Sequence, residues 1–354
     1  MSDRQDPAAD ESSARSALSV RRLLGDAIAA PLNVARLVSQ AVESVPMRAT
    51  APPKDAPPAA MQVSYNFFSG IGPEIRHPGG SLPGSNRWGV RPSAEHPVPV
   101  VLAHGTGGGA QTNWGTYVPL LANAGYSVFS LTYGAIPGSR WPISAIGGMA
   151  PMEDSAAEFG RFIDRVLEST GAEQVDVVGH SQGTLMPNYY ARFLGGAPKI
   201  RKYISLAPLW NGTTAFGVDV WRRLDIRLGV NPMDVIPCQS AAQMAAGSNF
   251  ITQMNAPVER APGVIESGPY VPGIEYTNIS TRHDEFVVPY TSGQVEPGPD
   301  DAVTNIVVQT DCTKDYSDHL GIAGSPRAAR LVLNALDPAS SEDVPCLYVP
   351  PFFG

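Results

Sequence analysis

Cysteine is scarce in this chain, with three residues, Cys238, Cys312 and Cys346, among 354. Three cysteines are too few for a disulfide framework, and their spacing lacks the short intervals typical of a metal site. The odd number allows either one bridge with a free thiol or three reduced thiols. A small disulfide-stapled scaffold is therefore excluded, and the cysteines indicate no metal.

Long hydrophobic runs and an excess of positive charge are also lacking. No stretch of about 18 apolar residues occurs, so the sequence predicts no transmembrane segment. The 25 Lys and Arg residues stand against 33 Asp and Glu residues, which gives a formal net charge of −8. This balance argues against nucleic acid or an anionic membrane surface as a partner.

Apolar residues, glycines and prolines are abundant in the chain. Hydrophobic residues make up 43% of it, which is enough for a sizeable core. The 35 glycines and 34 prolines exceed ordinary usage, and we interpret them as a sign of long ordered loops. One α/β domain with insertions can account for most of the length.

The first 60 residues differ in pattern from the rest. Arg21-Arg22 before two leucines faintly resembles a twin-arginine export signal, but polar residues interrupt the apolar region beyond them. Residues 32–45 place their apolar side chains on one helical face, and residues 46–60 indicate a proline-rich linker. The sequence thus predicts a leader over 1–60 and a main domain over 61–354.

Within the main domain, short apolar runs alternate with helical periodicity, the pattern of a parallel sheet with helices on both faces. The predicted strands are 98–103, 127–133, 175–179, 201–206, 274–281 and 303–309. Residues 152–169 and 326–336 have the apolar spacing of amphipathic helices. Residues 209–270 lack this alternation, and their apolar side chains predict a mostly helical cap over the site.

A Gly-x-Ser-x-Gly motif, Gly179-His180-Ser181-Gln182-Gly183, stands between a β-branched run and a helical pattern. This strand–turn–helix setting is typical of a nucleophile elbow, where a strained turn exposes the serine above a sheet. The main-chain N–H of Gln182 would then lie at a helix N-terminus, where negative charge is stabilised. We therefore predict Ser181 as a catalytic nucleophile.

A serine nucleophile needs a base and an orienting carboxylate, and in such proteins the acid precedes the histidine along the chain. Of the two histidines after the serine, His319 lies beyond the last predicted strand, where the base is expected. His283 is interpreted as a loop residue, and its neighbour Asp284, which comes after a predicted strand, as the acid. Glu285 and Asp318 are the rival carboxylates.

A glycine-rich stretch, His104-Gly105-Thr106-Gly107, comes directly after the first predicted central strand. Glycines there let the backbone turn its N–H groups toward the site, so we predict the N–H of Thr106, with that of Gln182, as an oxyanion hole. A phosphate-binding loop is the alternative, but its Lys and Ser/Thr are missing. His104 is interpreted as a brace for this loop.

These motifs resemble those of the class 2 lipases of bacteria, especially actinobacterial triacylglycerol lipases and esterases. Two further segments carry the resemblance, Thr281–Pro289 and Ser317–Gly321, and the oxyanion loop and elbow are more distantly similar to yeast lipase B. The resemblance covers about residues 62–350, with its four motifs in the same order.

The resemblance implies an α/β-hydrolase fold, which is a mostly parallel central sheet with helices on both faces. It implies a carboxylic ester substrate and neither a metal nor a cofactor. It also implies a Cys312–Cys346 bridge with Cys238 free. A secreted or cell-envelope location is a further implication, and a cytoplasmic location is the alternative, because the leader gives no clear export signal.

We expect hydrolysis of carboxylic esters, including acylglycerol-like lipids, through an acyl-enzyme on Ser181. An acyltransferase would use the same three residues with an alcohol in place of water. A ligand-binding module without turnover is the third alternative, and the complete set of Ser, Asp and His argues against it. The expected partners are a small-molecule or lipid ester and a lipid interface, and no nucleic acid.

Overall fold

The computed structural model describes residues 60–354 except 216–237, 262, 267 and 353. The chain divides between Ala59 and Ala60, and the second unit, Ala60–Gly354, is compact. The predicted leader helix and all but the last residue of the predicted linker lie outside the described residues. The second unit contains the predicted α/β domain.

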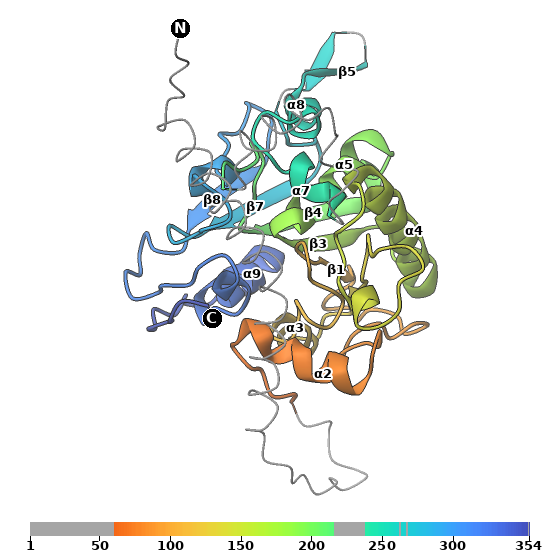
Figure 1. Ribbon diagram of the computed structural model, residues 1–354, viewed down its shortest axis with the longest axis vertical. Helices are drawn as coiled ribbons and strands as arrows, with labels where there is room; N and C mark the ends of the chain where they lie inside the picture. Colours follow the sequence, from red (N-terminus) through yellow and green to blue (C-terminus); the bar gives the residue numbers. More distant parts are fainter. Residues whose placement is uncertain (1–59, 216–237, 262, 267, 353) are drawn as a thin grey trace, which may run out of the picture. The chain divides into compact units, whose positions relative to one another are not determined.

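Six parallel strands form the central sheet, in the spatial order β2-β1-β3-β4-β7-β8 (Figure 1). Their bounds are Val100–Ala103 (β1), Val128–Ser130 (β2), Val175–His180 (β3), Ile200–Leu206 (β4), Glu275–Ser280 (β7) and Val303–Val307 (β8). Each strand overlaps one of the six predicted runs, so the predicted sheet is confirmed. The chain order reverses beside β1, and such a switch point opens a crevice at the carboxyl ends of the strands.

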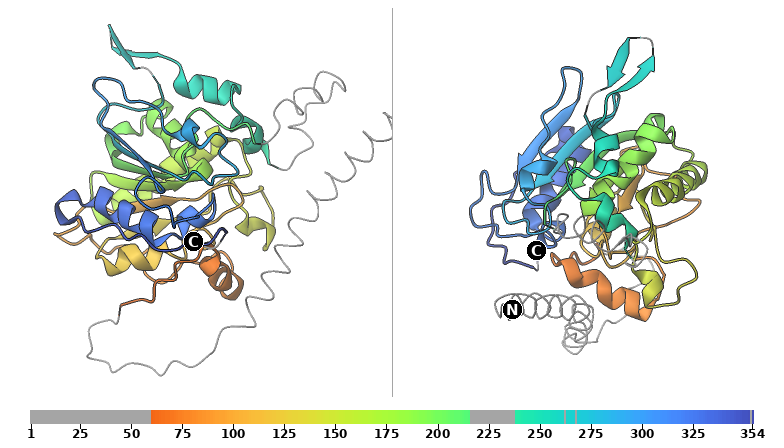
Figure 2. Two further views of the ribbon diagram at one scale, coloured as in Figure 1. Left: turned by 90° about the vertical axis from the view of Figure 1, so that its left-hand side faces the viewer. Right: turned by 45° about the horizontal axis from the view of Figure 1, so that its top comes forward.

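Helices cover both faces of the sheet (Figure 2). The main ones are α3 (Tyr117–Asn123), α4 (Met152–Thr170), α5 (Met186–Phe193) and α9 (Pro326–Leu336). Side chains of α4 and α5 share one core with Val101, whereas those of α3 and α9 share the other core with Val100. Because successive strand residues point to opposite faces, the apolar strands fill both cores at once.

The two long predicted helices are present at almost the predicted bounds, because the sequence marks their ends. α4 has Glu153 and Asp154 in its first turn, where acidic groups are favourable, and it ends at Gly171 in the left-handed conformation, with φ of +72°. α9 begins after Ser325, whose Oγ accepts the main-chain N–H groups of Arg327 and Ala328.

The segment after β4 carries α7 (Gln239–Gln243), α8 (Asn249–Asn255) and a hairpin of β5 (Val258–Ala261) with β6 (Val264–Glu266). Residues 216–237 of the predicted cap lie outside the described residues. The hairpin was not predicted, because its strands are too short to display an alternating pattern. Gly263, with φ of +78°, makes its turn.

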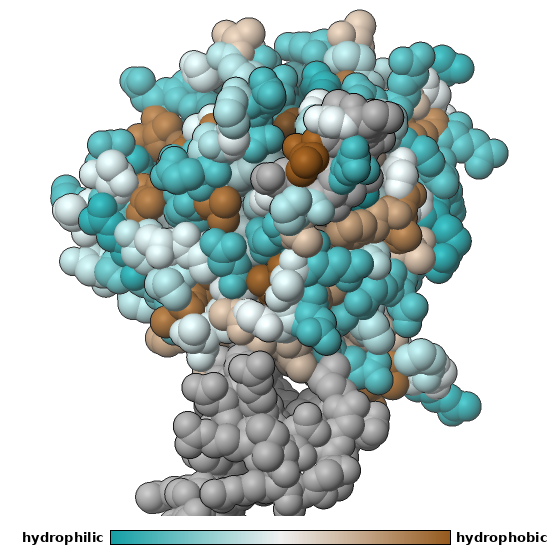
Figure 3. All heavy atoms as spheres, turned by 90° about the horizontal axis from the view of Figure 1, so that it is seen from above, coloured by the Kyte–Doolittle hydropathy of each residue, from teal (hydrophilic) through white to brown (hydrophobic). Residues whose placement is uncertain are grey.

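Shorter elements complete the unit. They are α2 (Ile71–Arg76) and the 3₁₀ turns η1 (Phe67–Gly70), η2 (Ile143–Ala145), η3 (Ser181–Thr184), η4 (Ala197–Lys199), η6 (Tyr290–Gly293), η7 (Gly321–Ala323) and η8 (Pro338–Ser340). None of the helices in the described ranges is long and apolar enough to cross a bilayer. Hydrophobic residues on the face in Figure 3 are interspersed among hydrophilic ones.

A disulfide joins Cys312, in the segment after β8, to Cys346 in the C-terminal tail. Cys238 is a free thiol. The pairing that the family resemblance implies is therefore confirmed. The tail is also held next to the His319 loop by a hydrogen bond from the N–H of Phe352 to Asp318 Oδ2, 2.8 Å long.

Candidate active site

Ser181 lies at the tight turn between β3 and η3, with φ of +55°. A left-handed backbone is unfavourable for a residue with a side chain and persists only where the surroundings impose it. A Cβ on Gly179 would lie 2.1 Å from the carbonyl oxygen of Gly183, and a Cβ on Gly183 would lie 1.9 Å from that of Ala103. The two glycines of the motif are thus required by close contacts with neighbouring main chain.

Three side chains from distant segments form a hydrogen-bonded row at the carboxyl ends of the strands. His319 Nε2 lies 2.8 Å from Ser181 Oγ. On the other side of the ring, Nδ1 lies 2.9 Å from Asp284 Oδ1 and 3.0 Å from Oδ2. The serine comes after β3, the aspartate after β7, and the histidine after β8, so the parallel sheet brings them to one edge.

The row is shielded from water. The side chains of His319 and Asp284 are 6% and 1% exposed. Asp284 Oδ1 also accepts the main-chain N–H groups of Phe286 at 3.0 Å and Val287 at 2.6 Å. These bonds fix the carboxylate against the ring. A neutral imidazole held in this way has its proton on Nδ1, which leaves the Nε2 lone pair directed at the serine hydroxyl.

The rival carboxylates contact main chain near the row. Glu285 Oε2 accepts the main-chain N–H of His319 at 3.1 Å, and Asp318 Oδ1 accepts that of Gly321 at 2.8 Å. Burial raises the pKa of Glu285, an effect partly offset by the hydrogen bond from the His319 main chain. His283 is exposed, and its ring centroid lies 5.3 Å from that of Tyr316.

The glycine-rich loop after β1 lies beside the elbow. A Cβ on Gly105 would lie 3.1 Å from Ser181 Cβ, so this glycine lets the two segments approach. The Gln182 main-chain N–H lies in the first turn of η3, where N–H groups lack helical partners. Thr106 is exposed, and its Oγ1 lies 3.7 Å from the sulfur of Met244, which comes after α7.

A second glycine pair, Gly147-Gly148, supports the predicted oxyanion loop, and the sequence alone did not reveal this role. The N–H of Gly107 donates to the Gly147 carbonyl at 2.9 Å, and the buried Gln182 side chain donates to that of Gly148 at 3.2 Å. Ser240 of α7 donates to the same Gly148 oxygen at 2.6 Å. Two adjacent glycines are the signal that could have marked this segment.

His104 braces the loop through both ring nitrogens. Its Nδ1 donates to the Gly105 carbonyl at 2.8 Å, and its Nε2 accepts the main-chain N–H of Tyr133 at 3.1 Å. One donor and one acceptor are what a neutral imidazole offers. Burial agrees with this state, because it lowers the pKa of His104 to about 4.

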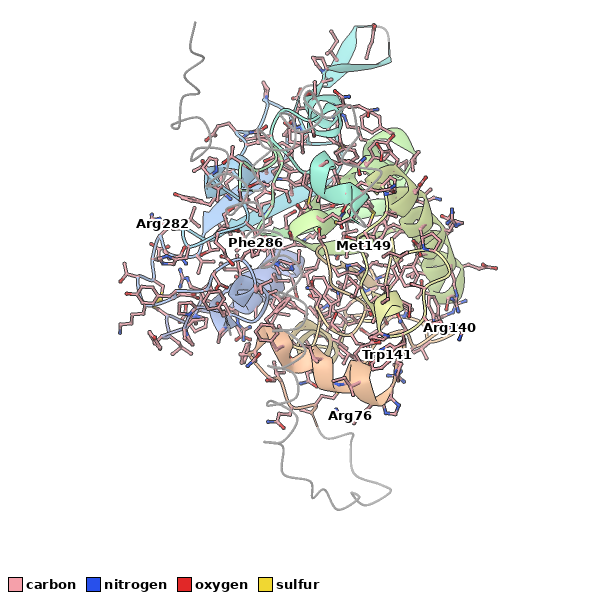
Figure 4. The ribbon with its side chains drawn as sticks, viewed as in Figure 1. Arg76, Arg140, Trp141, Met149, Arg282 and Phe286 are labelled. Carbon is pink, nitrogen blue, oxygen red and sulfur yellow. A yellow bond between two sulfur atoms is a disulfide. The ribbon has the colours of Figure 1, made fainter. Side chains whose placement is uncertain are left out.

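One aromatic side chain borders the row. The ring centroid of Phe286 lies 5.2 Å from that of His319. Figure 4 labels Phe286 and Met149, which lie on either side of the middle of the view. Within the part of the chain that the structure describes, no three His, Cys, Asp or Glu side chains come together in a group that could hold a metal ion.

Comparison with known proteins gives a family and a fold. The family model for Lipase (class 2) matches residues 97–292, which contain Ser181 and Asp284 and make up more than half of the chain. Aspergillus fumigatus lipase B is 17% identical, with a TM-score of 0.51 over 84% of this chain. Our chain spans 64% of that lipase, which is less than two thirds of its length.

Two further solved structures align at lower TM-scores. The mature form of the Bacillus licheniformis lipase BlEst2 is 12% identical, with a TM-score of 0.44 over 73% of this chain and 96% of that one. The RedJ thioesterase of Streptomyces coelicolor is 15% identical, with a TM-score of 0.41 over 83% and 97%. The sheet topology and the likeness to lipase B confirm the α/β-hydrolase fold. The matched family model shows that the chain belongs to the class 2 lipases.

Proposed function

We propose that this lipase-family chain cleaves carboxylic esters through a covalent acyl-enzyme on Ser181. The observation that carries the proposal is the row from Ser181 Oγ to His319 Nε2, 2.8 Å apart, and from His319 Nδ1 to Asp284 Oδ1, 2.9 Å apart. A hydroxyl aligned with a buried base and an orienting carboxylate is the arrangement that nucleophilic catalysis needs.

In the first half-reaction, Ser181 Oγ attacks the ester carbonyl carbon while His319 Nε2 takes the hydroxyl proton. The carbonyl oxygen becomes an oxyanion, and the main-chain N–H groups of Thr106 and Gln182 donate to it. The tetrahedral intermediate collapses, the C–O bond to the alcohol breaks, and the histidine returns its proton to the leaving oxygen. Asp284 stabilises the imidazolium that exists in between.

In the second half-reaction, water replaces the alcohol. His319 takes a proton from the water as its oxygen attacks the acyl carbon, and the same two N–H groups stabilise the second oxyanion. Collapse releases the carboxylic acid and returns the proton to Ser181. An acyltransferase would differ only in the acceptor, since an alcohol would take the place of water in this step.

A panel of p-nitrophenyl esters of increasing acyl length tests the proposal. We expect a burst of one p-nitrophenol per enzyme, and then slower steady turnover to the free acid. Adding a large excess of a primary alcohol separates the two acceptors, because a hydrolase still releases mainly acid. Predominant transfer to the alcohol would assign the acyltransferase reaction instead, and release without a burst or a trapped acyl group would contradict the covalent route.

We further propose acylglycerol-like lipids as substrates and contact with a lipid interface through the segment between β2 and Gly147. This segment exposes Trp141 by 44%, Ile143 by 49% and Ile146 by 39%. It leads directly into the glycine pair that supports the oxyanion loop, so apolar side chains and the site share one edge of the sheet. The side chain of Trp141 is labelled in Figure 4.

The interface proposal is tested with Trp141→Ser on emulsified triacylglycerol and on a soluble short-chain ester. Leu194→Ser is the matched control, because Leu194 is also 44% exposed but precedes β4, at the opposite edge of the sheet. We expect Trp141→Ser to lower turnover of the emulsion while turnover of the soluble ester is retained. Equal effects of the two substitutions on the emulsion would contradict a lipid contact at this segment.

A further inference from the structure

The main chain of His319 is held at both of its polar groups. Its N–H donates to Glu285 Oε2 at 3.1 Å, and its carbonyl oxygen lies 2.8 Å from His180 Nε2. The side chain of the same residue contacts Ser181 and Asp284. Every polar group of the proposed base therefore has a defined partner, and one of those partners is the residue immediately before the nucleophile.

The His180 ring lies in a closed environment between two loops. It is 2% exposed, and its centroid lies 5.1 Å from that of His319 and 5.9 Å from that of Phe67. Its second nitrogen, Nδ1, lies 3.1 Å from Asn113 Oδ1. The same Asn113 oxygen accepts the main-chain N–H of Gly105 at 3.1 Å, next to the predicted oxyanion residue Thr106.

A neutral imidazole carries one N–H, so the ring can donate through only one of its two nitrogens. The shorter contact, to the His319 carbonyl, is the one that a donated proton would produce. Burial, with the charge of His319 as a smaller cause, lowers the pKa of His180 to about 3, which favours the neutral ring. A second positive charge beside His319 would also oppose the imidazolium that forms during catalysis.

We propose that His180 is a positioning residue for the reaction proposed above: its Nε2–H donates to the carbonyl oxygen of His319 and fixes the main chain of that residue beside the nucleophile. The elbow and the histidine loop thus meet at one buried ring. A displacement of about 1 Å in such an arrangement can cost about 10²-fold in rate.

Two amide substitutions test the contact with His319. In His180→Gln the side-chain nitrogen reaches about as far as Nε2 and can still donate to the His319 carbonyl. In His180→Asn the nitrogen reaches only as far as Nδ1, so the contact with His319 is lost. His180→Leu removes the donor altogether, and His77→Gln, at an exposed histidine, is the control for the substitution itself.

We expect kcat on a soluble ester to fall about 10- to 100-fold in His180→Asn and His180→Leu, with KM nearly unchanged and with substantial recovery in His180→Gln. If His180 only filled space, kcat of the variants would instead follow their side-chain volumes, and the melting temperature would fall as well. Equal kcat in the Asn and Gln variants, or an effect on KM alone, would overturn the proposal.

A measurement on the unsubstituted protein holds even if a variant fails to fold. ¹⁵N NMR of histidine-labelled protein, with the His180 ring assigned through its own main chain, reports which nitrogen carries the proton. We expect a neutral ring at pH 7 with the proton on Nε2. A proton on Nδ1 with a bare Nε2 would overturn the assignment of the donor. Because this readout does not depend on turnover, it also separates failure of this inference from failure of the proposed function.

Discussion

Asp284 and Glu285 are neighbours in the chain, yet they contact different parts of His319. Asp284 Oδ1 lies 2.9 Å from the ring nitrogen Nδ1, whereas Glu285 Oε2 accepts the main-chain N–H at 3.1 Å. The first contact determines which ring nitrogen carries the proton, and the second only holds the loop. The two carboxylates should therefore differ sharply when each is replaced by its amide.

Asp284→Asn should lower kcat about 10⁴-fold near neutral pH, because an amide facing Nδ1 favours the wrong tautomer of His319. Glu285→Gln should have a small effect, since the amide oxygen still accepts the His319 N–H. Steady-state kinetics on a soluble p-nitrophenyl ester measures both. The reverse ranking would move the role of the acid to Glu285.

Two buried histidines outside the row should make the stability of the fold sensitive to acid. Burial lowers the pKa of His104 to about 4 and that of His180 to about 3, whereas the unperturbed value is 6.5. Below pH 6.5 the unfolded chain therefore binds protons that the folded chain does not. The free energy of unfolding should fall as pH drops, by up to about 1.4 kcal/mol per pH unit for each histidine.

Urea unfolding at pH 7, 6 and 5 tests this sign. Burial also raises the pKa of Glu285 and of Asp176, and these shifts make the free energy of unfolding rise as pH drops. The test therefore compares the pH profiles of two variants and does not rely on the slope of a single profile. The unsubstituted protein should lose stability more steeply between pH 6 and 5 than His180→Gln, by up to about 1.4 kcal/mol. Parallel profiles would contradict a neutral buried His180.

The sheet was predictable because its signal is local. Each central strand is buried on both faces, so a run such as Val100–Ala103 is apolar throughout and stands out from its surroundings. The elbow was predictable for a similar reason, since its glycines are dictated by contacts within a few residues and with the adjacent β1. The short β5–β6 hairpin gave no comparable pattern.

Apart from His104, the supports of the site were not predictable, because they depend on contacts between distant segments. Nothing in the sequence around Asn113 indicates that its side chain meets both Gly105 and His180, which lies 67 residues away. The contact of Ser240 with Gly148 spans 92 residues. Such pairs are set by the packing of the completed fold, whereas motifs reveal only groups whose spacing along the chain is fixed.

The Cys312–Cys346 bridge should stabilise both the fold and the His319 loop. It joins residues 34 apart, and closing a loop of that length is worth about 4 kcal/mol by chain-entropy estimates. Cys312 precedes His319 by only a few residues, so opening the bridge frees the loop that carries the proposed base. We expect Cys312→Ala with Cys346→Ala to lower the melting temperature and kcat.

Cys238→Ser is the control for the double substitution, because Cys238 is free. Its melting temperature should be close to that of the unsubstituted protein, and its response to reductant should be the same. If the double variant kept both its melting temperature and its kcat, the bridge would have no role in holding the His319 loop.

The proposed domain boundary predicts that a chain beginning at residue 60 is active. Residues 60–354 form a compact unit, and all the proposed catalytic groups lie within it. At its start, Asn123 binds the N–H of Met61 at 2.8 Å and its carbonyl at 2.7 Å. The shortened chain should keep the kcat/KM of the full chain on soluble esters. Loss of turnover without loss of folding would place part of the site within residues 1–59.

Ser181→Ala should abolish ester turnover, by about 10⁴-fold or more, because nucleophile, base and acid act as a unit. The substitution removes one hydroxyl and little packing, so the melting temperature should change little. Residual activity of more than a few per cent, in protein free of contaminating esterase, would show that another group attacks the ester.

The central claim is that Ser181 carries the acyl group, and covalent trapping tests it most directly. A p-nitrophenyl alkylphosphonate mimics the tetrahedral intermediate and should release one p-nitrophenol per chain as it binds to the nucleophile. Peptide mass spectrometry should then find one phosphonyl group, on Ser181, and none on the Ser181→Ala protein. A label on any other residue, or equal labelling of the Ser181→Ala protein, would contradict the account.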